Sequence, residues 1–88
     1  MNNDIMIVMK DYTNTIADRL KEARKEKRFS QEDMGRLLKL SHVSYGAYER
    51  GEALPSINTL MELSTVLEKP LFYFLGQSAG QDRYLTNQ

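Results

Sequence analysis

The chain of 88 residues contains no cysteine and only one histidine, His42. It can therefore form no disulfide, no thiolate zinc site and no cysteine nucleophile, and a catalytic triad or histidine metal cluster would depend on a single ring. A phosphate-binding glycine loop is also missing. We expect no metal, no cofactor and no enzymatic activity. The longest apolar run, residues 5–9, is far shorter than the roughly 20 residues that span a bilayer, so we expect a soluble, cytoplasmic protein with no membrane partner.

The chain also lacks an excess of positive or negative charge, because 12 Lys and Arg balance 12 Asp and Glu. The charges are unevenly distributed, however: residues 15–50 hold nine basic and six acidic side chains. Positive potential therefore concentrates in the first half of the chain. The length fits one small domain, and 41% hydrophobic with 27% charged residues is typical of a packed fold.

Both ends of the chain differ in character from its middle. Residues 1–14 read as a frayed extension or, alternatively, as an arm whose apolar stretch pairs as an edge strand with a second subunit. Residues 77–88 have little to bury and are expected to form a flexible tail. The domain itself is expected over residues 15–76.

Capping signals and apolar spacing predict two helices in the first half of the domain. Thr15, with Asp18 three residues on, is the expected N-cap of the first helix, and Ser30 with Asp33 forms the same capping pattern for the second. In the first helix, Ile16, Leu20, Ala23 and Lys27 recur at helical spacing. The apolar face of the second helix is predicted at Met34, Leu37 and Leu38.

Three further short helices follow, which makes the predicted fold all-α. Ser41 caps the third, and Gly51 supplies its left-handed stop. Ser56, after the break at Leu54-Pro55, caps the fourth helix. Its apolar face is predicted at Ile57, Leu60, Met61, Ser64 and Leu67. After Pro70 a final helix is expected over residues 71–75, ending at Gly76.

The segment from Ser30 to Gly51, SQEDMGRLLKLSHVSYGAYERG, resembles the helix-turn-helix of the Cro and phage-repressor (XRE-like) class. The wider resemblance covers residues 16–75, including Leu20-x-x-x-Arg24 and the Pro55-Ser56 entry to the fourth helix. It implies a compact five-helix, lambda-repressor-like domain that binds double-stranded DNA through its third helix. It also implies a transcriptional regulator, most simply a repressor acting as a homodimer on a two-fold operator.

The short connection between the second and third helices supports this reading independently. Few residues separate Leu38 from Ser41, so the two helices must cross steeply, and Gly35 puts almost no side chain at their closest approach. The angle is expected to be filled by Met34, Leu38, Leu40, Tyr45 and Tyr48. Such a pair can place one helix in a major groove about 12 Å wide.

Two residues depart from the family pattern. Arg28 and Lys39 stand where the family often has glycine because the chain visits a left-handed conformation there. A non-glycine residue at such a position costs roughly 1 kcal/mol, which a packed domain can absorb. Both also add positive charge.

The start of the third helix is expected to face base edges. His42 can donate or accept a hydrogen bond, Val43 can meet a thymine methyl group, and Ser44 is permissive. One turn on, Ala47 can also touch a methyl group, while the small Gly46 either lets the helix sit deep or merely accommodates packing. The alternative for His42 is an ordinary solvated residue.

Phosphate contacts are expected around this helix. Gln31 heads the second helix, where exposed backbone N–H groups favour an anion, and its amide is a candidate phosphate clamp. The other candidates for phosphate contact are Arg36, Lys39, Ser41, Arg50 and Asn58. For the three basic residues the alternative is a solvated surface charge.

Structural roles are assigned to the remaining motif residues, Arg24, Gly35, Tyr45, Tyr48, Glu49 and Gly51. The spacing of the two tyrosines favours core packing over base stacking. The family resemblance implies that Arg24 pairs with Glu49 in a partly buried ion pair.

The apolar cluster Phe72, Tyr73, Phe74 and Leu75 is the predicted dimer interface, with completion of the monomer core as the alternative. A second functional class also stays open at this point. Members of the family serve as antitoxins, so the chain could be a protein-interaction module with a toxin or another regulatory protein as partner.

Overall fold

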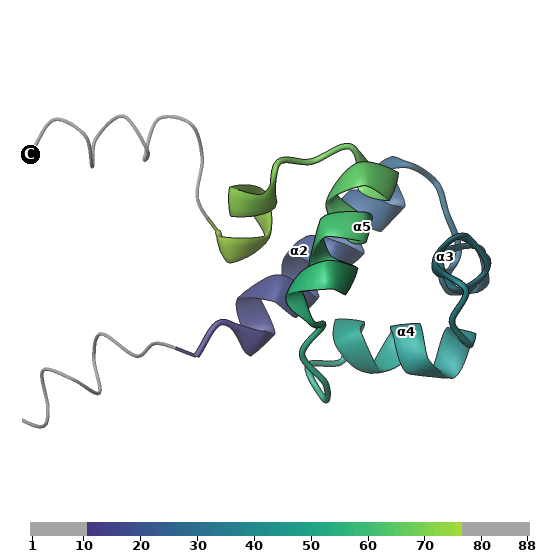
Figure 1. Ribbon diagram of the computed structural model, residues 1–88, viewed down its shortest axis with the longest axis horizontal. Coiled ribbons are helices and arrows are strands. Elements are labelled where there is room, and N and C mark those ends of the chain that lie inside the picture. Colours follow the sequence, from purple (N-terminus) through teal and green to yellow (C-terminus); the bar gives the residue numbers. More distant parts are fainter. Residues whose placement is uncertain (1–10, 77–88) are drawn as a thin grey trace, which may run out of the picture.

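The computed structural model describes residues 11–76, which form an all-helical domain (Figure 1). Its elements are α2 (Thr13–Glu26), α3 (Gln31–Leu38), α4 (His42–Glu49), α5 (Ile57–Leu67) and a short 3-10 helix, η1 (Leu71–Leu75). No helix within this range is long and apolar enough to cross a membrane. The predicted tail and residues 1–10 of the predicted extension lie outside the described residues.

The fifth helical element is a 3-10 turn and not the α-helix that a five-helix fold implies. Its amides bond to carbonyls three residues back, Tyr73 to Pro70 and Gly76 to Tyr73, each at 3.0 Å. Five residues between Pro70 and the left-handed Gly76 (φ 82°) leave room for little more than one such tight turn. The predicted bounds of this element are confirmed.

Serine caps fix the starts of three helices as predicted. The Ser30 hydroxyl accepts from the Asp33 amide at 2.9 Å, and the Asp33 carboxylate accepts from the Ser30 amide at 2.8 Å, which completes a capping box. Ser41 and Ser56 accept the amides three residues on in the same way. These bonds satisfy N–H groups that a helix end would otherwise leave without a partner.

The first helix begins earlier than predicted, and Thr15 is not its N-cap. α2 starts at Thr13, where the Asp11 carboxylate accepts both the backbone amide, at 2.9 Å, and the side-chain hydroxyl, at 2.6 Å. The expected boundary between residues 14 and 15 therefore falls inside a helix. An acidic residue two positions before the first helical residue was the signal for this start.

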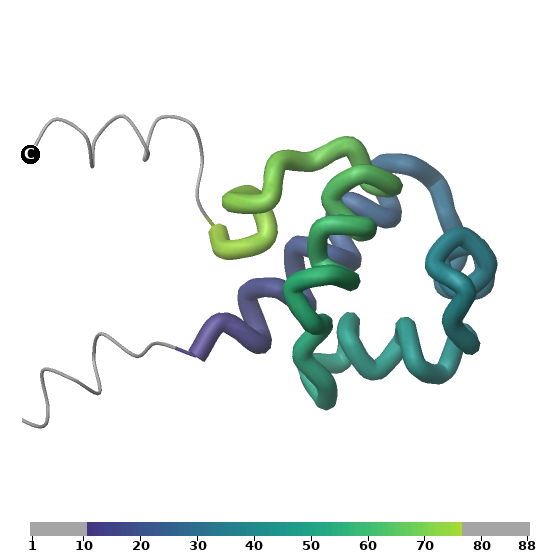
Figure 2. Tube along the Cα trace, in the orientation of Figure 1, coloured from purple at the N-terminus to yellow at the C-terminus, as the bar shows by residue number. Residues whose placement is uncertain are grey.

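Every element contributes to one core. α3 packs against α4, α2 packs against α4 and η1, and α5 packs against α3 and η1, an arrangement that can be followed along the tube in Figure 2. The buried cluster consists of Ile16, Leu20, Ala23, Met34, Leu38, Tyr45, Leu60, Leu63, Leu67 and Phe74, with Leu40 and Tyr48 packed against it.

Three predicted core residues face solvent instead. Leu37 is 51% exposed, Ile57 61% and Met61 57%, whereas Leu63, which the prediction omitted, is completely buried. Each step along a helix turns by about 100°, so a residue next to a core position need not share its face. In α5 the buried row is 60, 63 and 67.

Three non-glycine residues adopt the left-handed conformation. Arg28 (φ 61°) and Lys39 (φ 60°) do so as predicted, and Glu68 (φ 57°), which ends α5, was not anticipated. Lys39 ends α3, and its conformation reverses the chain so that α4 can begin at His42. Because a non-glycine residue is strained in this conformation, the turn between α3 and α4 costs conformational free energy.

We predict that Lys39→Gly stabilises the domain by about 1 kcal/mol, because glycine adopts this conformation without the steric penalty. Urea denaturation of the variant and the parent chain measures the difference. Lys21→Gly, in the exposed middle of α2, is the matched control and is expected to destabilise by about 1 kcal/mol. A loss of stability at both positions would contradict the proposed strain at Lys39.

Candidate nucleic-acid interface

A buried carboxylate, Glu49 at the end of α4, organises the site. Its side chain is 1% exposed. Arg24 donates to it twice, from Nε at 2.6 Å and from Nη2 at 3.0 Å. Gln31 Nε2 donates at 3.1 Å and the Tyr45 hydroxyl at 2.5 Å. The two carboxylate oxygens therefore accept four hydrogen bonds.

These bonds join three helices at one point. Arg24 comes from α2, Gln31 is the first residue of α3, and Glu49 with Tyr45 belongs to α4. Arg24 Nη1 also donates to the Phe29 carbonyl at 2.9 Å, in the connection between α2 and α3. The predicted ion pair of Arg24 and Glu49 is confirmed, whereas the parts played by Gln31 and Tyr45 were not predicted.

The protonation states of Glu49 and Tyr45 follow from their burial and their hydrogen bonds. Burial by itself raises the pKa of Glu49, but the hydrogen bonds from Arg24, Tyr45 and Gln31 outweigh it, so that pKa lies below its usual value. Burial, reinforced by the bond to Glu49, raises the pKa of Tyr45, which keeps the phenol protonated as a donor. The carboxylate is thus held charged in the interior.

The steep crossing of α3 and α4 needs a residue without a side chain. Figure 1 shows α3 end-on while α4 runs lengthwise across the view. A Cβ on Gly35 would lie 2.7 Å from the Leu40 carbonyl oxygen and 3.2 Å from the His42 nitrogen, so only glycine fits. Tyr45 and Tyr48 are in edge-to-face contact, 6.2 Å between ring centres, which confirms their packing role.

The other end of α4 is also fixed by a glycine. Gly51 is left-handed (φ 73°), as predicted, and a Cβ there would lie 2.7 Å from Asn14 Oδ1 of α2. The amide of Glu52 bonds back to the Ala47 carbonyl at 2.9 Å and closes the helix end.

The predicted base-facing residues lie together at the exposed start of α4. His42, Val43 and Ser44 are all exposed, and Val43 has 61% of its surface open to solvent. Ala47 lies one turn on and is half-buried. The start of α4 thus presents both polar and apolar side chains to solvent.

The predicted phosphate-facing residues are differently placed. Gln31 is half-buried against Glu49, and the Ser41 hydroxyl is occupied with capping α4. Arg50 is exposed and pairs with Glu52 at 3.0 Å. Asn58 is exposed in the first turn of α5.

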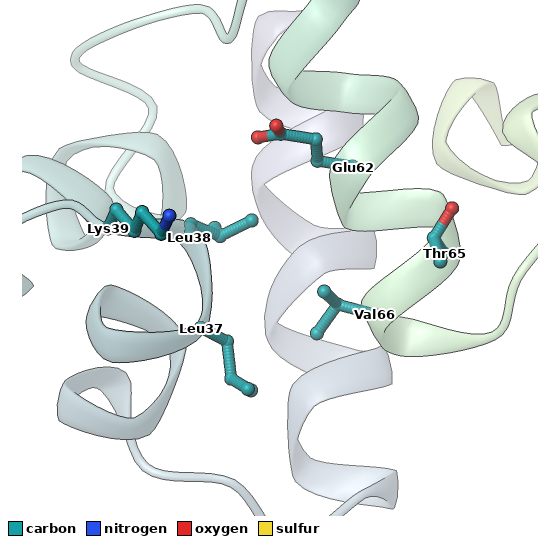
Figure 3. Close-up of a pocket in the computed structure, with 6 residues that line it drawn as sticks. All are labelled: Leu37, Leu38, Lys39, Glu62, Thr65 and Val66. Carbon is teal, nitrogen blue, oxygen red and sulfur yellow. The ribbon is translucent and has the colours of Figure 1, made fainter.

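Two other predicted phosphate contacts lie along grooves of α3. Arg36 pairs with Asp33 on its own helix and lines a groove with Phe29 and Leu37. Lys39 lines a groove of about 310 Å³ between α3 and α5. Figure 3 shows Leu37, Leu38 and Lys39 on one side of that groove and Glu62, Thr65 and Val66 on the other.

The predicted dimer cluster is largely used inside the domain. Phe74 is completely buried, so it belongs to the monomer core and the interface prediction is wrong for this residue. The cationic groups of Arg19 and Lys69 each lie over the Tyr73 ring, 4.9 Å from its centroid. Phe72 and Leu75 are half-buried. The aromatic residues complete the core because η1 closes over α2 and α5.

Over residues 11–76, no group of three His, Asp or Glu side chains could hold a metal ion. What the geometry provides is a pair of short helices crossing steeply, with the first turn of the second one exposed. A helix held in this way can enter the major groove of a duplex. The fold and the site therefore define a helix-turn-helix domain.

The chain belongs to the helix-turn-helix family, whose pattern matches residues 20–74. The HTH-type transcriptional regulator DicA of Escherichia coli is 35% identical over 68 residues, which are 76% of this chain and 50% of DicA. The uncharacterized HTH-type transcriptional regulator YqaE of Bacillus subtilis is 36% identical over 59 residues, 67% of this chain and 51% of YqaE. This chain thus spans about half the length of these relatives.

A solved structure has the same fold. The restriction-modification controller protein C.AhdI from Aeromonas hydrophila superposes with a TM-score of 0.64 at 30% identity, covering 72% of this chain and 94% of that protein. DicA and YqaE are both named as transcriptional regulators and not as enzymes, in agreement with the expectation from the sequence.

We predict that acid destabilises the domain partly through Glu49. Its folded-state pKa lies below the ordinary value of 4.5, so its contribution is complete above that value and is lost as the pH falls through the lower folded pKa. Glu49→Gln should cost about 3–5 kcal/mol at neutral pH, because it leaves the mostly buried Arg24 without its anion.

Urea denaturation from neutral pH down to about pH 3 measures both effects. The variant should lose less stability on acidification than the parent chain does. Glu62→Gln, at an exposed position of α5, is the control and should follow the parent. An acid dependence that Glu49→Gln leaves unchanged would contradict the assignment.

Proposed function

We propose that this chain binds double-stranded DNA sequence-specifically through α4 and represses transcription as a homodimer on a two-fold operator. The observation that carries the proposal is the exposed first turn of α4 on a helix whose other face is anchored at Glu49. An anchored helix reads bases with little entropy left to lose on binding.

The exposed turn offers complementary chemistry to base edges. His42 presents ring nitrogens that donate or accept a hydrogen bond, and Val43 presents methyl groups that suit a thymine methyl. Ser44 can bond to several bases, and Ala47 is small enough to lie against a methyl group. These four residues are the proposed direct readers.

Phosphate contacts would hold α4 in register. Arg50, Lys39, Arg36 and Asn58 are exposed donors, and Gln31 and Ser41 lie at the starts of α3 and α4, where backbone N–H groups favour anions. Repression is the proposed mode because occupancy of an operator excludes other proteins and needs no further surface. The names of the relatives support regulation of transcription in general.

We predict that His42→Ala changes the base preference at one position of each half-site by about 1–3 kcal/mol and leaves the others unchanged. Selection from random duplexes at a stated salt concentration, followed by sequencing, gives the profile for each chain. Asp18→Asn, at an exposed position of α2, is the control.

Two outcomes count against the proposal. An unaltered profile in His42→Ala would remove α4 as the reading helix. Salt-sensitive retention of DNA without enrichment of any sequence by the parent chain would contradict specific binding, and would favour the interaction-module alternative with a protein partner.

We further propose that a second copy of the chain covers Leu54, Ile57 and Met61, the apolar patch. These side chains are 59%, 61% and 57% exposed at the start of α5 and in the residues before it. Ile57 and Met61 share one face of a helix in which Glu62 is the single charged residue. A two-fold axis brings identical surfaces together, so a face with few like charges suits self-association.

We predict that Ile57→Asp shifts the chain to monomer in sedimentation equilibrium, because it would bury a carboxylate without a partner at the interface. Leu37→Asp, equally exposed on α3, should leave the association unchanged. A dimer that survives Ile57→Asp would show that the apolar patch is not the dimer interface. The interface would then be assigned to Phe72, Tyr73 and Leu75 of η1.

A further inference from the structure

Gly46, in the middle of α4, lies beneath two polar side chains from different helices. A Cβ at this position would be 2.8 Å from Arg50 Nη1 and 3.1 Å from Gln31 Oε1. Both distances are shorter than ordinary contacts, so both side chains occupy the space that any other residue would take. Gly46 is buried although its neighbours in the first turn of α4 are exposed.

Arg50 reaches this position by folding back along its own helix. It lies one turn after Gly46, and its Nε is fixed by the Glu52 carboxylate at 3.0 Å. Gln31 reaches it from α3, with its Nε2 bound to Glu49 and its Oε1 directed at the space over Gly46. The guanidinium of Arg50 and the side-chain amide of Gln31 thus both lie over Gly46.

We propose that Gly46 is a positioning residue for DNA binding, which sets the Arg50 guanidinium beside Gln31 as one phosphate contact. This inference rests on the proposed function. A guanidinium held at its Nε still presents Nη hydrogens, which suit a phosphate oxygen. The Glu52 carboxylate offsets the positive charge of Arg50. Phosphate binding therefore depends more on where the guanidinium lies than on the net charge beside it.

The geometry makes Gly46→Ala an informative variant. The added methyl group would meet the exposed end of Arg50, which can move aside, and Gln31 Oε1, which needs to shift only slightly and can keep its bond to Glu49. Alanine favours a helix over glycine, so the variant should unfold at the same temperature as the parent chain or a higher one. Its DNA binding should nevertheless weaken, because Arg50 is displaced from Gln31.

The test compares Gly46→Ala, Arg50→Ala and the double variant on the duplex selected by the parent chain, over a series of salt concentrations. Each single variant should weaken binding by about 3–10-fold and lower the slope of log K against log salt by about one. The double variant should bind no worse than Arg50→Ala, because Gly46 acts through Arg50. Lys21→Ala, which removes an exposed charge from α2, should keep the parent slope.

Different results separate the two proposals. A Gly46→Ala chain with the parent slope, or a double variant clearly weaker than Arg50→Ala, would overturn the positioning role and leave specific DNA binding standing. A parent chain that retains no duplex would overturn the proposed function and this inference together. A lowered unfolding temperature in Gly46→Ala would also contradict the inference, since the methyl group would then disturb the fold.

Discussion

The buried carboxylate of Glu49 is the constraint on which the rest of the structure depends. It is the one charged group among the fully buried residues described, and it is tolerated because four donors from three helices converge on it. Removing a charge from water is expensive, so the carboxylate is stable inside only while Arg24, Gln31 and Tyr45 keep their places. The same requirement fixes α2, α3 and α4 relative to one another.

The bonds to Glu49 help to stabilise two short helices. α3 and α4 each have eight residues, a length at which an isolated helix is marginal in water. Their stability comes from serine caps at their starts, from the core residues Met34, Leu38 and Tyr45, and from the bonds to Glu49. Only the first turn of α4 is left exposed, and it is there that the proposed contacts with DNA lie. The buried face of α4 thus holds the helix in place, while its exposed first turn carries the proposed function.

Interactions between residues close in sequence made much of the fold predictable. Ser30, Ser41 and Ser56 cap helices because their hydroxyls satisfy free amides close in sequence. Gly35 is dictated by the backbone of residues 40–42 and Gly51 by its left-handed conformation. The ion pair of Arg24 and Glu49 followed from the family resemblance. The exposed start of α4 was also placed correctly, although the roles of its residues on DNA stay predictions.

Features set by tertiary packing were harder to predict. Leu37, Ile57 and Met61 have the spacing of a core face, but the direction of the core depends on where the neighbouring helices lie. Phe74 is buried because η1 folds back over α2, which spacing within five residues does not reveal. The bonds from Gln31 and Tyr45 to Glu49 join residues 18 and 4 apart in sequence, and only the folded chain brings all of them to one carboxylate.

The central claim is that the ion pair of Arg24 and Glu49 holds the helices in place, and a double-mutant cycle tests it most directly. Urea denaturation of Arg24→Gln, Glu49→Gln and the double variant gives the coupling free energy. We predict a coupling of about 2–3 kcal/mol, so that the double variant loses that much less stability than the two single losses added together. Losses that simply add, to within about 0.5 kcal/mol, would contradict the claim.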